Sequence, residues 1–184
     1  MKKLIILFLA FGLLIGGTVT AQASDRSGFG LETDLMVYRI GESDSYSFGA
    51  NYYKDQFKYS LFNYHINVVD AHLTEGFSKN IVDAYVCKVE RYFNVNASGF
   101  FLGGGILYES SDLTTSANSQ KGHLNMYSLL ISLGYDWNPT KKFHIIPNLH
   151  ILLPLEDTDL KIGTDEVKLA SWGLEPGVKI GIEF

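Results

Sequence analysis

Cysteine, proline and charged residues are all scarce in this chain of 184 residues. The one cysteine, Cys87, excludes an intrachain disulfide and any multi-cysteine metal motif. The 15 basic residues are outnumbered by 20 acidic ones and form no run, so nucleic acid is not an expected partner. Aromatic residues reach 14% and glycines number 18, a composition that favours a β protein over a helical one.

No long apolar run occurs after the first residues of the chain. The N-terminal "MKK" precedes the apolar "LIILFLAFGLLIGG", and "TVTAQAS" follows with Ala21 and Ala23 at the small-residue positions of a cleavage site. This order is typical of a secretory signal peptide over residues 1–23. We expect cleavage near Ala23, export, and one domain over residues 24–184. An uncleaved N-terminal membrane anchor is the alternative.

The C-terminal stretch "SWGLEPGVKIGIEF" alternates between two kinds of residue. One set is almost wholly apolar and ends with Val178, Ile180, Ile182 and Phe184, whereas the other consists of glycine and charged residues. A period of two predicts a strand with one face in an apolar medium and the other in a polar one.

Seven further segments show the same alternation, and they cover residues 28–38, 46–54, 57–68, 77–93, 99–109, 125–137 and 143–155. Two of them are ambiguous. In the third, a bulge near Asn63 would turn Phe62, Tyr64, Ile66 and Val68 outward. The segment 77–93 also fits a helical stripe, but a strand is favoured because its neighbours need an antiparallel partner.

The connections between these segments alternate in length. "DQ", "NVNASG" and "NPTKK" are short, whereas most of the others are longer and polar, the longest being "SSDLTTSANSQKGH" at residues 110–123. Eight strands with short turns at one end predict an all-β fold, an eight-stranded antiparallel up-and-down transmembrane β-barrel. Aromatic residues near the short turns predict an interfacial girdle. A soluble lipocalin-like barrel would instead place the charges outside.

The signal peptide, "RYFN…GFFLGGGILYE" and "GVKIGIEF" resemble small Gram-negative outer-membrane β-barrel proteins, the group that includes OmpX, OmpW and the N-terminal part of OmpA. The resemblance implies an outer-membrane location, with the lipid bilayer, lipopolysaccharide and the outer-membrane insertion machinery as partners. It also implies that the insertion machinery reads the terminal pattern, which here consists of Val178, Ile180, Ile182 and Phe184.

The inward face of the predicted barrel is polar. An eight-stranded barrel is filled by its own side chains, and charges buried there must pair or hydrate. We therefore expect a structural salt-bridged cluster in the lumen, with a narrow solute path or a catalytic cluster as alternatives. The cluster comprises Glu32, Asp34, Lys88, Glu90, Asp136, His144, His150, Glu175, Lys179 and Glu183.

The histidines do not form a recognisable catalytic motif. None of the five is followed by x-Ser, the pair carried by the deacylase branch of the lipid A-modifying barrels. His144 and His150 lie six residues apart, or roughly 20 Å along a strand, too far to share one metal. We therefore predict a non-enzymatic protein without cofactor or metal, with a structural or surface-interaction role and at most slight permeability to small solutes. A lipid A-modifying enzyme and a soluble lipocalin-like carrier are the alternatives, and the sequence does not identify a surface partner.

Overall fold

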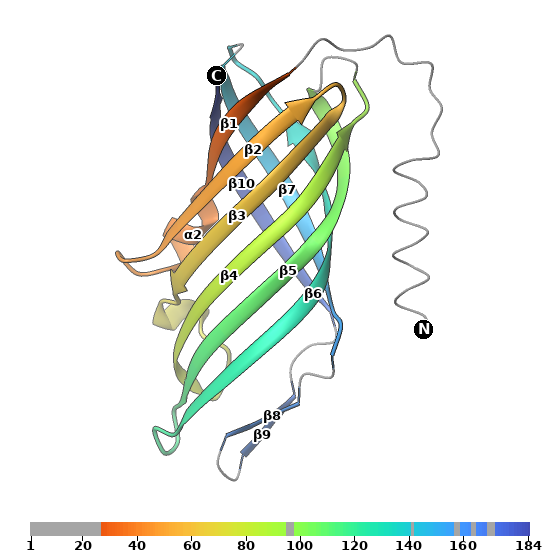
Figure 1. Cartoon of the computed structure of the whole chain (residues 1–184). Helices are drawn as coiled ribbons and strands as arrows, with labels where there is room; N and C mark the ends of the chain where they lie inside the picture. The colour runs from red at the N-terminus through yellow and green to blue at the C-terminus, as the bar shows by residue number, and fades with distance from the viewer. Residues whose placement is uncertain (1–26, 95–97, 141, 157–158, 163–164, 169–171) are drawn as a thin grey trace.

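The computed structural model is a closed barrel of eight antiparallel strands (Figure 1). It describes residues 27–94, 98–140, 142–156, 159–162, 165–168 and 172–184, so the predicted signal peptide and its cleavage site lie outside the described residues. Each strand pairs with its neighbours in sequence, and β1 closes the barrel against β10. The barrel strands are β1 (Ser27–Asp34), β2 (Tyr46–Lys54), β3 (Phe57–Asn67), β4 (Phe77–Tyr92), β5 (Gly99–Thr115), β6 (Lys121–Asp136), β7 (Phe143–Pro154) and β10 (Gly173–Glu183).

All eight predicted segments contribute a barrel strand, and the predicted fold class is confirmed. The ambiguous segment 77–93 is a strand, because β4 pairs with both β3 and β5 along most of its length. The end of the barrel that holds the two-residue turn at Asp55 and Gln56 is called the short-turn end below, and the opposite end is called the loop end. Asp55 has a φ of 56°, a left-handed conformation that aspartate tolerates well and that suits such a tight turn.

The first strand ends earlier than its sequence predicts. We expected residues 28–38 to form one strand, but β1 stops at Asp34 and the short helix α2 (Leu35–Ile40) follows. Asp34 is the N-cap of this helix, and its Oδ1 accepts a hydrogen bond from the Met36 N–H at 3.0 Å. The alternation continued through Val37, but this side chain is buried against the loop end of the barrel rather than facing outward.

The bulge predicted near Asn63 does not occur. The pairing of β3 with β2 and with β4 continues without a shift through this residue. Phe62 is therefore buried inside the barrel, and Tyr64 and Ile66 line an internal cavity. The prediction was wrong because these apolar side chains pack against apolar residues of β4, β5, β6 and β7 within the lumen, an environment that the sequence pattern does not distinguish from lipid.

Two of the predicted loop boundaries also change. Most of residues 110–123 belongs to the sheet, because β5 and β6 remain paired as far as Thr114 and Lys121. The last long connection contains a hairpin of β8 (Asp159–Ile162) and β9 (Asp165–Lys168), and β10 begins after it at Gly173. Ile162 packs with Phe77 and Leu113 in a small core that supports the projecting end of β5 and β6.

The seam between β1 and β10 is short. It consists of five residue pairs, from Gly30–Glu183 to Asp34–Lys179. Pro176 lies beyond the last pair. The backbone N–H of Phe184 points to the β1 side, where it donates to Phe29 O, whereas the N–H of Glu183 points to the β7 side. Backbone groups alternate sides along a strand, so the nitrogen of Pro176, an even number of residues from Phe184, also faces the β1 side. Proline lacks the N–H that a further pair would use, and this agrees with a position where the partner strand has ended.

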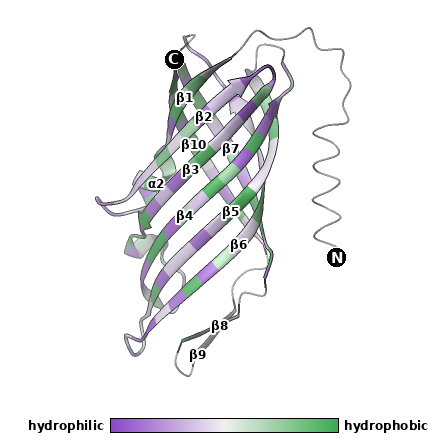
Figure 2. Ribbon diagram, viewed as in Figure 1, coloured by the Kyte–Doolittle hydropathy of each residue, from purple (hydrophilic) through white to green (hydrophobic). Residues whose placement is uncertain are grey.

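Hydrophobic and hydrophilic residues alternate along the strands, as Figure 2 shows. The outward residues include large exposed apolar side chains such as Leu61, Tyr85, Ile106 and Phe100, whereas charged residues such as Glu32, Lys58 and Glu90 are buried inside. In the part of the chain that the structure describes, no helix is long and apolar enough to cross a membrane.

Candidate functional site

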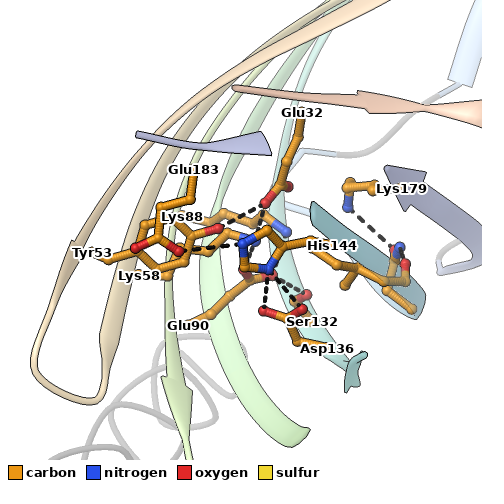
Figure 3. A network of polar contacts seen from close by, with 12 residues as sticks. Glu32, Tyr53, Lys58, Lys88, Glu90, Ser132, Asp136, His144, Lys179 and Glu183 are labelled. Atoms are coloured by element: carbon orange, nitrogen blue, oxygen red, sulfur yellow. Dashed lines mark hydrogen bonds and ion pairs between the residues drawn. The ribbon is translucent and has the colours of Figure 1, made fainter. Parts of the chain in front are cut away.

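A network of charged side chains fills the short-turn half of the lumen (Figure 3). At its centre, Lys58 Nζ on β3 lies 2.8 Å from Glu32 Oε1 on β1 and 3.1 Å from Glu90 Oε2 on β4. Glu90 also forms an ion pair with Lys88 and accepts a hydrogen bond from Ser132 Oγ at 2.9 Å. Each of these side chains is almost fully buried, so the charges compensate one another in a space with little water.

A second group in the network is centred on His144. Its Nδ1 lies 3.0 Å from Asp136 Oδ1, and its Nε2 lies 3.2 Å from Glu183 Oε2. Tyr92 completes the group by donating its hydroxyl to Asp136 Oδ2 at 3.1 Å. His144 thus connects the ends of β6 and β10 at the short-turn end.

Glycines on β5 make room for the network. A Cβ on Gly103 would lie 2.7 Å from the Cγ of Glu90, and one on Gly105 would lie 2.6 Å from the Cβ of Lys88. Real Cβ atoms do not approach other atoms this closely, so a larger residue would displace the charged side chains or the backbone. The glycine-rich "GGG" of this strand therefore serves the packing of the lumen.

Lys179 extends the polar contacts toward the middle of the barrel. Its Nζ donates to Asn148 Oδ1 at 3.3 Å and lies 3.3 Å from His150 Nε2. His150 and His144 therefore have different partners, in agreement with the expectation that they do not form one site. Within the described residues, no group of three His, Cys, Asp or Glu side chains is placed to hold a metal ion.

The structure places the ten predicted lumen residues in two environments. Glu32, Lys88, Glu90, Asp136, His144 and Glu183 belong to the network, and His150 and Lys179 contact each other next to it. Asp34 and Glu175 instead line the cavity at the loop end, where Glu175 is exposed. The predicted cluster lacked four polar groups of the network, namely Lys58, Tyr53, Tyr92 and Ser132, although each has the parity of the other inward polar residues of its strand.

The loop half of the lumen is largely apolar. Its core contains Phe62, Ala84, Val86, Leu107, Leu130 and Leu152, all buried. Next to this core lie a cavity of about 490 Å³ and a smaller one of about 250 Å³, and Glu109 and Glu175 line both of them. The lumen is therefore divided between a packed polar half and a hollow half with apolar walls.

The four residues of the predicted insertion pattern share the outward face of β10. Val178 and Ile180 are half-buried, whereas Ile182 and Phe184 are exposed. Phe184 also anchors the chain end, because its N–H donates to Phe29 O at 2.8 Å.

The fold is shared with barrels of known structure. The N-terminal β-barrel domain of Pseudomonas aeruginosa OprF superposes with a TM-score of 0.53 and 13% identity, over 86% of this chain and 100% of that domain. Neisserial surface protein A superposes with a TM-score of 0.54 and 10% identity, over 86% of this chain and 95% of that chain. No protein-family model and no curated protein sequence matches the chain. The chain thus has the fold of the small eight-stranded outer-membrane barrels that its sequence resembles.

Proposed function

We propose that this chain is a non-enzymatic protein of the Gram-negative outer membrane, with a structural or surface-interaction role. The observation that carries the proposal is the reversed distribution of polarity, with apolar side chains on the outside of the barrel and a charged network inside. A lipocalin-like carrier has the opposite distribution, because its apolar residues line the ligand cavity and its charges face water.

Two belts of aromatic residues frame the outer surface. Near the short-turn end, Phe100 packs on Tyr135 with ring centroids 4.9 Å apart, and toward the loop end Tyr108 packs on Tyr127 at 5.0 Å. Phe100 and Tyr108 are eight residues apart on β5, which at a strand tilt of ~40° is about 20 Å along the barrel axis. This separation is close to the apolar band of ~25 Å that outer-membrane barrels present to lipid.

Beyond the second belt the outward residues become polar. His65 pairs with Asp83 at 2.7 Å, and His123 pairs with Asp112 at 2.7 Å. These four residues lie on the loop-end side of Leu61, Tyr85, Tyr127 and Tyr108 on their respective strands. The change from apolar to ionisable residues supports a membrane boundary at the aromatic belt, with the loop end in water and in contact with lipopolysaccharide.

The packed network argues against a general pore. The side chains of Lys58, Lys88 and Glu90 are at most 2% exposed, so they occupy the cross-section of the short-turn half. We therefore expect permeation of small solutes to be slight or absent.

The loop end is the part of the barrel that we propose for surface interaction. There β5 and β6 stay paired as far as Thr114 and Lys121, whereas β6 pairs with β7 only from Ser128, so the β5–β6 hairpin projects from the barrel. We further propose that Val178, Ile180, Ile182 and Phe184 direct insertion through the outer-membrane machinery.

The location is tested by expressing the full chain in a Gram-negative host and fractionating the envelope. We expect the protein in the outer membrane, with an electrophoretic mobility in SDS that changes on boiling, as a closed barrel requires. Replacing Phe184 with Ser should reduce the amount inserted, whereas Phe29→Ser, which alters a comparably exposed aromatic at the same end, serves as the control. A soluble periplasmic protein without a heat-dependent shift would contradict the proposal.

The two roles are then separated with the same strain. Shortening the β5–β6 hairpin between residues 112 and 123 should leave insertion unchanged and abolish contact with other cells if the role is surface interaction. A structural role predicts that loss of the whole chain, but not of the hairpin tip, sensitises cells to detergent. Altered lipid A mass in cells that express the protein would favour the enzymatic alternative.

A further inference from the structure

The hollow half of the lumen has the properties of a ligand site. The larger cavity, of about 490 Å³, falls within the size range of small-molecule pockets in proteins. Much of its wall is apolar and is provided by Val37, Ile66, Val82, Ala84, Leu107 and Leu130. The exposed residues Arg39 and His72 also line it, so the cavity reaches the loop-end surface.

The floor of this cavity is closed. His150 and Gly177 lie at its inner end, where Lys179 contacts His150. Because Lys58, Lys88 and Glu90 fill the short-turn half, a molecule can enter only from the loop end. The site is thus a chamber with one entrance, at the face that we propose is outside the cell.

Three carboxylates lie around this apolar space. Asp34, Glu109 and Glu175 all line the larger cavity. Of the described residues that line it, Arg39 alone is a lysine or arginine. Among the described residues, no basic nitrogen lies within 4.0 Å of any of the three carboxylates. The negative charge of the chamber is therefore not neutralised by the ion pairs that neutralise the network below.

The smaller cavity contributes polar atoms that have no partner. Ser128 is fully buried, and among the described residues neither its Oγ nor the buried Asn80 Oδ1 has a hydrogen-bond partner. Both residues line the smaller cavity, and Glu109 and Glu175 connect this cavity with the larger one. Buried polar groups are normally satisfied, so each of these oxygens indicates a place for a hydrogen-bond donor, and Ser128 is the one closer to Glu109 along the paired strands β5 and β6.

We propose that the chamber binds an organic ammonium ion that carries a compact apolar body. The apolar body occupies the larger cavity, and the ammonium group lies between Glu109 and Glu175. An ammonium group has three N–H donors and no acceptor, which matches carboxylate oxygens together with Ser128 Oγ. A carboxylate ligand would instead face three carboxyl groups and a single guanidinium.

Three probes of the same shape and different charge test the proposal. 1-Adamantylamine is cationic, 1-adamantanol is neutral and adamantane-1-carboxylate is anionic. The barrel is placed in phosphatidylcholine nanodiscs after its heat-dependent mobility has been verified, and empty nanodiscs correct for partition into lipid. Trp172 lines the smaller cavity, so in the Trp137→Phe variant it is the remaining tryptophan and reports binding by fluorescence. We expect the amine to bind at least ~10-fold more tightly than the alcohol, the factor that one charge-assisted hydrogen bond provides.

Variants assign the selectivity to the chamber. The double variant E109Q/E175Q should lose the preference for the amine, whereas E75Q, which removes an exposed carboxylate outside the chamber, should retain it. A84F should block all three probes by filling the larger cavity, whereas A50F places the same ring on the outward face of β2 and should not.

Equal or tighter binding of the alcohol or the carboxylate would overturn the proposal, as would unchanged selectivity in E109Q/E175Q. Either result would leave the outer-membrane assignment intact, because only inserted, heat-modifiable protein enters the assay.

Discussion

Lys58 Nζ on β3 and Glu32 Oε1 on β1 lie 2.8 Å apart, although β2 separates their strands. The contact crosses the lumen instead of following the sheet. Together with the 3.1 Å contact to Glu90, it joins three strands through one ammonium group. The stability of the barrel should therefore depend on this lysine more than on any single residue pair between neighbouring strands.

The Lys58→Met variant should be destabilised by about 3–5 kcal/mol, because it leaves two carboxylates without their shared cation in a buried site. Unfolding in urea from lipid vesicles measures the change. Lys54→Met is the control, since Lys54 is exposed at the end of β2 and should change the free energy of unfolding very little. Equal stability of the two variants would show that the network does not support the fold.

The Gly103→Ala variant should also destabilise the barrel, by about 1–3 kcal/mol, because the added methyl group overlaps Glu90. The adjacent Gly104→Ala points its methyl group away from the lumen and should cost less than about 0.5 kcal/mol. The two variants differ only in the face they alter, so a similar cost for both would contradict the packing described for the network.

The network should also determine conductance. The unaltered protein should produce no channel steps in planar bilayers, because charged side chains occupy the short-turn half of the lumen. Replacing Lys58, Lys88 and Glu90 together with Ser removes most of this packing and should produce measurable steps, provided that the variant retains its heat-dependent mobility. Steps of equal size in the unaltered protein would show that the network does not obstruct the lumen.

The position of the lipid is tested on β6. Leu133 lies outward between Tyr127 and Tyr135, so Leu133→Arg should cost about 2–4 kcal/mol in lipid vesicles. His123→Arg lies on the same strand and face beyond the aromatic belt, places a cation beside Asp112, and should cost about 0–1 kcal/mol. If His123→Arg were the more costly change, the membrane boundary would be misplaced.

The sequence predicted the strands well because period-two alternation depends only on neighbouring residues. In β10, Lys179 and Ile180 could be assigned to opposite faces from their spacing alone, and the structure buries Lys179 completely. The segment 77–93 was resolved by a topological requirement rather than by its own pattern, since an up-and-down barrel needs a strand there.

The sequence did not predict which lumen residues contact one another. Lys58 contacts Glu32 because the curvature of the closed sheet brings the inward side chains of β1 and β3 together on the inner side of β2. Which two residues come together depends on the register of all three strands, and this register is a property of the whole sheet. The apolar chamber was missed for another reason. Phe62 and Ile66 have the side chains expected toward lipid, and only the continuous pairing of β3 places them inside.

Pro176 has a consequence for how deeply the barrel can sit in the bilayer. Beyond Asp34, β1 offers no partner to β10, and among the described residues no strand lies on that side of Gly173–Val178. Unpaired backbone groups are not tolerated in hydrocarbon unless protein or water satisfies them. If the barrel spans a membrane as we propose, the side around Pro176, where the short helix α2 rather than a strand lies against β10, should stand above the lipid, whereas the opposite wall, in which β4 and β5 stay paired as far as Thr115, imposes no such limit. In the proposed membrane, the early end of β1 therefore limits the immersion depth on this side, and Pro176 leaves that side with one N–H fewer to satisfy.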